Sequence, residues 1–237
     1  MKYLLLALMW TGYCSLHSYL ISIRFTNQMA RLLKNYYVFY RLAYVMISFI
    51  LLVPIFKFKA QLNVTDPVIV TYEFPLSIVR YVLISGSLLM FFWTFFFHYD
   101  SLSFFGIRQI LDLGKTKTTD PSEKIKKTGL LGIIRHPMYF AVIIYLWCRT
   151  FRLSDIVVNI VLTLYILIGT RLEENKLVME FGDPYIKYQH EVPMLIPFTK
   201  IKGNGFSFFQ KKWFTFGDKC WRSFSTMQNI KCCIYIL

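Results

Sequence analysis

The chain has 237 residues, of which 56% are hydrophobic and 19% aromatic, and its formal net charge is +14 at pH 7. A soluble domain of this length normally carries more charge and fewer Phe and Tyr residues, so the composition argues against one. A nucleic-acid-binding domain is also disfavoured, because the basic residues cluster where apolar runs end. We therefore expect a protein whose main partner is the lipid bilayer and which binds no nucleic acid.

Five apolar runs predict transmembrane helices, at residues 4–22, 38–56, 76–97, 137–151 and 156–170. The last two runs give roughly 22 Å of helix each, which is short of a bilayer core of ~30 Å. Because only residues 152–155 separate them, they predict a tight antiparallel hairpin whose ends are extended by neighbouring helix. The fold class is therefore an all-α, polytopic membrane helix bundle of about five spans.

Composition divides the chain into three regions. Residues 1–98 hold three spans, and residues 99–197 hold an interfacial amphipathic segment (99–113) and the hairpin. Residues 198–237 form a tail rich in Lys, Arg, Phe and Trp. Such a composition is typical of a segment lying on an anionic membrane surface, and a poorly ordered terminus is the alternative.

The charge distribution predicts the orientation. Lys and Arg gather after the first span, after the third span and in the tail, and cationic loops tend to stay cytoplasmic. We expect a multi-pass protein with its N-terminus outside and its C-terminus in the cytoplasm, in the inner membrane if the source is bacterial. No C-x-x-C or Cys/His cluster predicts a metal site.

Two short polar segments flank the hairpin: Arg135-His136-Pro137-Met138-Tyr139 and Arg171-Leu172-Glu173-Glu174. The first enters the membrane and the second leaves it on the same side, so we expect His136 and Glu173 to share one cytoplasmic-side pocket. Ionisable residues this close to a bilayer need partners or a ligand. These two segments are therefore the main candidates for a functional site.

The position of Glu173 on its helix leaves two interpretations open. Glu173, Leu177 and Phe181 share one stripe, so the carboxylate lies among apolar residues and needs a cation. The cation is either a bound group or one of three side chains, Arg135, His136 and Arg171. A plain interfacial salt bridge from Arg135 to Glu173 or Glu174 would satisfy the same spacing. Pro137 suits a first helical turn, whose free N–H groups can bind a carboxylate.

Three further polar residues have less specific signals. Arg108 and Gln109 end the interfacial segment, where they could control substrate entry, or Arg108 could simply snorkel to the interface. His17 lies in the middle of the first span, where an ionisable residue is costly. We expect His17 to hydrogen-bond within the bundle, to Tyr residues or near Arg41 or Arg80.

These motifs resemble a known superfamily. The blocks are Gly129-Leu-Leu-Gly-Ile-Ile-Arg135-His136-Pro137-Met138-Tyr139, Arg171-x-Glu173-Glu174-x-x-Leu177, Phe181-Gly182-x-x-Tyr185-x-x-Tyr188, Val192-Pro193 and Ile196-Pro197. They resemble the isoprenylcysteine carboxyl methyltransferase-like membrane methyltransferases. His98-Tyr-Asp100-Ser-Leu-Ser-Phe-Phe-Gly106-Ile-Arg108-Gln109 and Leu16-His17-Ser18 are more similar to the bacterial branch, which includes methanethiol S-methyltransferase; nurim is a distant member. The similarity covers roughly residues 14–198.

The resemblance implies an S-adenosylmethionine-dependent methyltransferase acting on a small or lipophilic nucleophile, whether thiol, carboxylate or amine. It places the cofactor against His136, Pro137, Met138, Tyr139 and Glu173, with Glu174 the secondary partner. Arg135 is a further candidate for cofactor binding, because its guanidinium could hold the cofactor carboxylate. His136 and Arg171 are the candidate catalytic residues. The chain departs from the family pattern at Leu131, where the family has Tyr, and at Gly169, where the family has a substrate-side Arg that Arg171 could replace.

Two other classes remain open. Membrane sterol reductases share an Arg-His-x-x-Tyr element and use NADPH, but have more spans and a longer chain. A non-enzymatic, nurim-like membrane protein would keep the fold without the chemistry. Cofactor binding separates the three readings: S-adenosylmethionine, NADPH or neither.

Overall fold

The structure, a computed structural model, describes residues 1–99, 101–111 and 127–199. The tail after residue 199 and most of the predicted polar loop at 114–129 lie outside the described residues. The described helices are α1 (Lys2–Leu20), α2 (Ile23–Leu33), α3 (Tyr40–Asn63), α4 (Leu76–Trp93), α5 (Ser101–Phe104), α6 (Ile107–Leu111), α7 (Pro137–Cys148), α8 (Leu153–Phe181) and α9 (Asp183–Glu191). Shorter helical turns, η1 (Lys34–Phe39), η2 (Thr94–His98) and η3 (Gly129–Gly132), and strands β1 (Val68–Val70) and β2 (Phe151–Arg152) join them.

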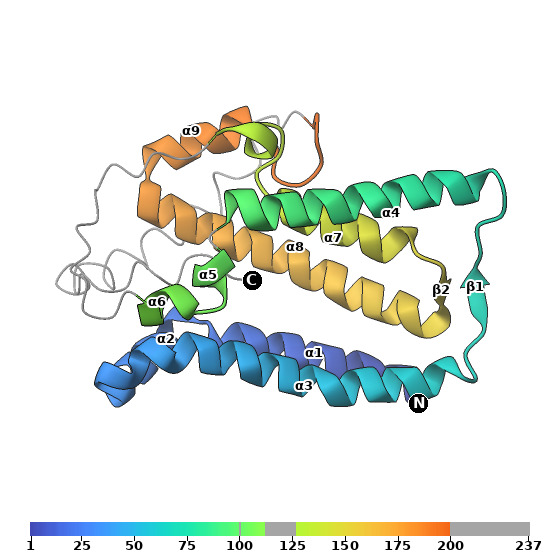
Figure 1. Cartoon of the computed structure of the whole chain (residues 1–237), viewed down its shortest axis with the longest axis horizontal. Helices are drawn as coiled ribbons and strands as arrows, with labels where there is room; N and C mark the ends of the chain where they lie inside the picture. Colours follow the sequence, from blue (N-terminus) through green and yellow to red (C-terminus); the bar gives the residue numbers. More distant parts are fainter. Residues whose placement is uncertain (100, 112–126, 200–237) are drawn as a thin grey trace.

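The long helices form a bundle with α8 at its centre (Figure 1). Helices α1 and α3 pack together on one side of α8, and α4 and α7 pack together on the other. The predicted all-α bundle is thus confirmed, since the two strands contribute only a few residues.

Within the described residues, three helical stretches are long and apolar enough to cross a membrane, by length and composition. They are residues 23–63, 76–98 and 153–181, and α7 is a shorter apolar helix. Helix α1 occupies the first predicted span without meeting the same criterion, so the count of five spans stays a prediction.

The outward faces of the long helices carry large apolar side chains. On α4, Val82 is 65% exposed and Leu89 72% exposed. A water-soluble monomer rarely exposes contiguous apolar surface of this kind. A lipid environment accounts for it, because hydrocarbon tails cover such a surface at no cost.

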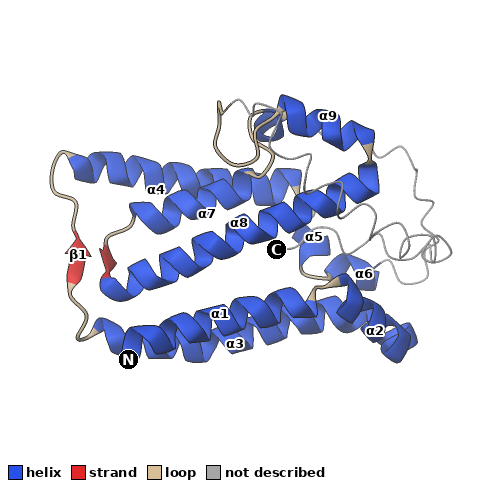
Figure 2. Ribbon diagram, turned by 180° about the vertical axis from the view of Figure 1, so that it is seen from behind, coloured by secondary structure: helices blue, strands red, loops and turns tan. Residues whose placement is uncertain are grey.

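The predicted hairpin consists of α7 and α8, and its tight connection includes β2, which pairs antiparallel with β1 (Figure 2). Asp66, which is 3% exposed, fixes this end of the bundle. Its carboxylate accepts hydrogen bonds from the Tyr3 hydroxyl (2.6 Å) and the Ser154 backbone N–H (2.7 Å). Its backbone carbonyl accepts a hydrogen bond from the Arg152 guanidinium (2.6 Å). Asp66 therefore ties α1 and the loop after α3 to the start of α8.

The opposite end of the bundle holds the functional candidates. Helices α2, α5, α6 and α9 gather there, together with the start of α7 and the end of α8 (Figure 1). The hairpin thus brings its two polar ends to one side, as the spacing predicted.

Asp66→Ala should destabilise the protein, because it leaves the Tyr3 hydroxyl and the Ser154 N–H without their acceptor. We expect a loss of about 1–3 kcal/mol in the free energy of unfolding. Thermal unfolding of the detergent-purified protein measures it, with Val64→Ala as the control, because Val64 is 85% exposed. An unchanged midpoint for Asp66→Ala would contradict this role.

Candidate functional site

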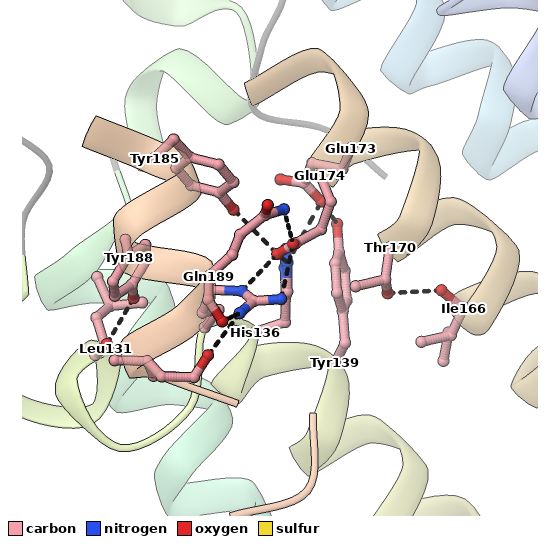
Figure 3. Close-up of polar contacts among 12 residues, drawn as sticks. Leu131, His136, Tyr139, Ile166, Thr170, Glu173, Glu174, Tyr185, Tyr188 and Gln189 are labelled. Atoms are coloured by element: carbon pink, nitrogen blue, oxygen red, sulfur yellow. Dashed lines mark hydrogen bonds and ion pairs between the residues drawn. The ribbon is translucent and has the colours of Figure 1, made fainter. Parts of the chain in front are cut away.

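The candidate site forms where α7 begins, α8 ends and α9 folds back over both. Arg135 and His136 come directly before α7, and Glu173 and Glu174 lie about two turns before the end of α8. Gly182 has φ +62° and separates α8 from α9, a backbone conformation that favours glycine. The reversal at Gly182 lays α9 across the hairpin ends (Figure 3).

Glu174 is the centre of a buried hydrogen-bond network (Figure 3). Arg135 donates from Nε (2.8 Å) and Nη2 (2.7 Å) to its two carboxylate oxygens, a bidentate ion pair. His136 Nε2 lies 2.8 Å from the same carboxylate, and Tyr185 and Gln189 of α9 donate to it as well. Glu174 is 3% exposed, so its charge is both buried and fully paired.

The rest of the Arg135 guanidinium binds the chain after α9. Nη1 donates to the backbone carbonyls of Gln189 and Val192. The backbone N–H groups of Arg135 and His136 donate to the carbonyls of Pro193 (2.9 Å) and Met194 (3.1 Å). Residues 189–194 are therefore held against the start of α7 from both main chain and side chain.

The network fixes the proton on the His136 ring. Glu174 is a carboxylate paired with Arg135, so it can only accept, and His136 must carry its hydrogen on Nε2. In the neutral ring Nδ1 then presents a lone pair. His136 is 2% exposed, and Nδ1 has no hydrogen-bond partner among the described residues. The hydrogen bond to Glu174 thus leaves Nδ1, on the other side of the ring, as a buried acceptor.

Glu173 is the second group with spare bonding capacity. Its Oε2 accepts a hydrogen bond from the Tyr139 hydroxyl (2.9 Å) and lies 3.9 Å from His136 Nδ1. The Glu173 side chain is only 10% exposed. The Tyr139 ring stacks on the His136 ring, with centroids 5.5 Å apart and planes 14° apart. His136, Tyr139 and Glu173 therefore form one contiguous, largely buried group beside the Glu174 network.

Two tyrosines of α9 stay neutral donors. Burial, and then the nearby Glu174 charge, raise the pKa of Tyr185 far above its ordinary value. Burial raises the pKa of Tyr188 to about 12. The Tyr188 hydroxyl donates to the carbonyl of Leu131, the position where a family tyrosine was expected. Tyr185, Tyr188 and Gln189 had no assigned role in the sequence reasoning, although the two tyrosines belong to the quoted blocks.

The other predicted residues lie around this cluster. Pro137 is buried at the first turn of α7, Met138 is half-buried, and Arg171 is exposed on α8. Arg108 is exposed and lines a cavity of about 340 Å³, while Gln109 is half-buried beside it. The remaining wall residues are Phe96, Phe97, His98, Tyr99, Ser101 and Leu102.

That cavity adjoins the turn before the site. A Cβ at Gly129 would lie 3.1 Å from His98 Nε2, and Gly129 has φ +62°. The His98 ring therefore packs closely against η3, the turn that leads to Arg135. No group of three or more His, Cys, Asp or Glu residues arranged to hold a metal ion occurs in the described ranges.

Comparison with known proteins gives partial matches. The chain is 41% identical over 95 residues to a methanethiol S-methyltransferase of Pseudomonas deceptionensis, covering 39% of this chain and 36% of that protein. It is 35% identical over 106 residues to one of Crocosphaera subtropica (44% and 40%) and 32% identical over 117 residues to methanethiol S-methyltransferase 1 of Bradyrhizobium diazoefficiens (49% and 40%).

The chain thus spans 36–40% of the length of these curated relatives. No family model and no solved structure matches it significantly. The resemblance to membrane methyltransferases, with the bacterial methanethiol branch, is confirmed over these partial alignments.

The two adjacent glutamates should respond differently to the same substitution. Glu174→Gln leaves the Arg135 guanidinium buried without its counter-charge, so we expect the thermal midpoint to fall by on the order of 10 °C. In Glu173→Gln the amide oxygen can still accept the hydrogen bond from Tyr139, so the thermal midpoint should change little. Thermal unfolding in detergent decides this, and equal effects of the two substitutions would refute the separation of roles.

Proposed function

We propose that this chain is an integral membrane methyltransferase that uses S-adenosylmethionine as methyl donor. The observation that carries the proposal is the buried group of His136, Tyr139 and Glu173, in which a nitrogen and a carboxylate keep unused bonding capacity. The partial similarity to methanethiol S-methyltransferases supports it independently.

The donor set fits this cofactor. The Glu173 carboxylate suits the α-amino group or the ribose hydroxyls, and the N-terminus of α7, which has no side-chain cap, suits the α-carboxylate. The Tyr139 ring suits a sulfonium through a cation–π contact. Pro137 and Met138 line the same turn. When bound, S-adenosylmethionine would supply an electrophilic methyl group on sulfur.

We assign Arg135 and Glu174 to positioning. Four N–H groups of the Arg135 side chain already bind protein acceptors, and the Glu174 carboxylate binds four side chains. Glu174 has no capacity left for a further strong interaction, and Arg135 keeps only one of its five N–H groups, on Nη2. Their contribution to cofactor binding is to hold His136 and the start of α7 in place.

Methyl transfer from S-adenosylmethionine requires few acid or base groups from the protein. Methyl transfer from a sulfonium removes positive charge, so the nucleophile needs to be positioned and desolvated. If the nucleophile is a thiol, His136 Nδ1 is a free acceptor for its proton, because Glu174 keeps the ring hydrogen on Nε2. We propose that Arg171 orients the acceptor at the mouth of the site and that Arg108 and Gln109 border its entry.

The proposed acceptor is a small or lipophilic nucleophile. The relatives are named for methanethiol, which makes small thiols the first class to screen, ahead of carboxylates and amines.

Glu173→Gln should abolish binding of S-adenosylmethionine to the detergent-purified protein, because an amide cannot neutralise the bound cation. Isothermal titration calorimetry measures binding, with a loss of at least about tenfold in affinity expected. Glu180→Gln, at an exposed position of the same helix, is the matched control and should bind like the wild type.

NADPH titrated into the same samples tests the reductase alternative, and we expect no heat of binding. If a folded sample binds neither cofactor, the non-enzymatic reading replaces ours. Unimpaired S-adenosylmethionine binding by Glu173→Gln would remove Glu173 from the site.

The proposed topology places the site in the cytoplasm, with the N-terminus outside. In a variant lacking the native cysteines, Val64→Cys lies between α3 and β1 and Asn35→Cys lies in η1, both exposed. A membrane-impermeant maleimide should label position 64 in intact cells and position 35 only after permeabilisation. The reverse pattern would invert the topology.

A further inference from the structure

A second cavity of about 200 Å³ lies between α1 and α3. Its walls are mostly apolar or aromatic: Tyr13, Val45, Phe49, Leu52 and Phe104, with His17, Tyr44 and Ser48 as its polar end. None of these residues belongs to the site described above. The cavity is therefore a separate feature that the proposed donor site does not use.

The polar end is a short hydrogen-bonded chain. The Tyr44 hydroxyl lies 2.7 Å from His17 Nε2 and 2.8 Å from Nδ1, and Ser48 Oγ lies 3.3 Å from Nδ1. One hydroxyl hydrogen can be directed to only one of the two nitrogens. Ser48 Oγ itself donates to the Tyr44 carbonyl. The arrangement is therefore one imidazole and two hydroxyls that face a largely apolar space.

A purely packing role explains this cavity poorly. An ionisable side chain within an apolar span is costly and by default marks a functional site. Interiors pack with few voids larger than a water molecule, and a hydrogen-bonded histidine needs no empty space beside it. The sequence expectation that His17 binds tyrosine is confirmed, whereas Arg41 and Arg80 bind elsewhere, to Phe104 and Thr150.

The volume limits the ligand. Sites for drug-sized molecules run from about 300 Å³ upward, and an apolar cavity of about 150 Å³ in another protein takes benzene. A cavity of about 200 Å³ therefore fits a molecule of benzene-like size. The polar end offers that molecule one hydrogen-bonding position.

The cavity also lies between the lipid-facing surface and α8. Phe49 is 57% exposed, so one wall residue reaches the outer surface of the bundle. On the other side, Tyr165 of α8 lies against His17 (ring centroids 6.4 Å apart) and bonds Ser18 (3.2 Å). Tyr165 and Glu173 are eight positions apart on one helix, about 12 Å along its axis.

We propose that this cavity binds a small apolar thiol that enters from the bilayer, with the thiol at His17, Tyr44 and Ser48. Its role as a holding site, from which the acceptor moves on to His136 and Glu173 for transfer, rests on the proposed function. Binding itself does not, because it requires no methyl donor. Tyr44 and His17 would then set specificity for a small molecule with one polar group.

The test uses the full chain in detergent and two probes, 4-fluorothiophenol and fluorobenzene, observed by ¹⁹F NMR titration in a buffer acidic enough to keep the aryl thiol protonated. Val45→Phe fills the cavity, and Val53→Phe makes the same change at an exposed position of α3. Both probes also partition into micelles, and this background is the same for both variants. Tyr44→Phe removes the hydroxyl at nearly constant volume, and Tyr40→Phe, whose hydroxyl bonds the Leu20 carbonyl instead, is its control.

We expect Val45→Phe to weaken binding of both probes by about tenfold or more and Val53→Phe to leave it unchanged. We expect the thiol to bind several-fold more tightly than fluorobenzene, and Tyr44→Phe but not Tyr40→Phe to abolish that preference.

Equal binding by Val45→Phe and Val53→Phe would overturn the site. If Val45→Phe does not fold, loss of the preference in Tyr44→Phe supports the proposal and its retention overturns it. If the wild-type protein binds the probes as expected but does not bind S-adenosylmethionine, the donor site is refuted and the cavity proposal stands.

Discussion

The bidentate ion pair between Arg135 and Glu174 is the interaction on which the arrangement at this end of the bundle depends. It joins the start of α7 to the end of α8, and through Tyr185 and Gln189 it also holds α9. A carboxylate buried this deeply is stable only because every lone pair has a donor. The same pairing forces the His136 hydrogen onto Nε2. The ion pair therefore leaves His136 Nδ1 and Glu173 as the groups that can meet a ligand.

The sequence predicted the meeting of these residues and could not predict how they divide the work. An apolar hairpin with polar ends returns position 171 to the same side of the bundle as position 136. The proximity of the two polar segments therefore follows from the similar lengths of the two apolar runs. Adjacent glutamates point about 100° apart on a helix. Which of the two pairs with Arg135 depends on the segment that packs against the end of α8. That segment is α9, whose position is set by the reversal at Gly182. Apolar periodicity carries no information about this long-range packing, so Glu174 was expected only as the secondary partner.

In the long helices too, the sequence predicts where the elements lie but not how their side chains pack. The apolar runs located α3, α4, α7 and α8, because helix length and composition are local properties. His17 stood out because an imidazole is costly in a span, and a tyrosine partner was expected on that ground alone. Its partner Tyr44 and the cavity beside them depend on how side chains of α1 and α3 interlock, and no single-chain pattern encodes such a void.

The most direct test of the account is transfer of a labelled methyl group from S-adenosylmethionine to a small thiol by the purified protein. The account predicts labelled thioether from the wild type and from Glu180→Gln, and none above background from Glu173→Gln in a sample that unfolds like the wild type. Undiminished transfer by Glu173→Gln would contradict the central claim, which is that Glu174 holds the site together while Glu173 binds the donor.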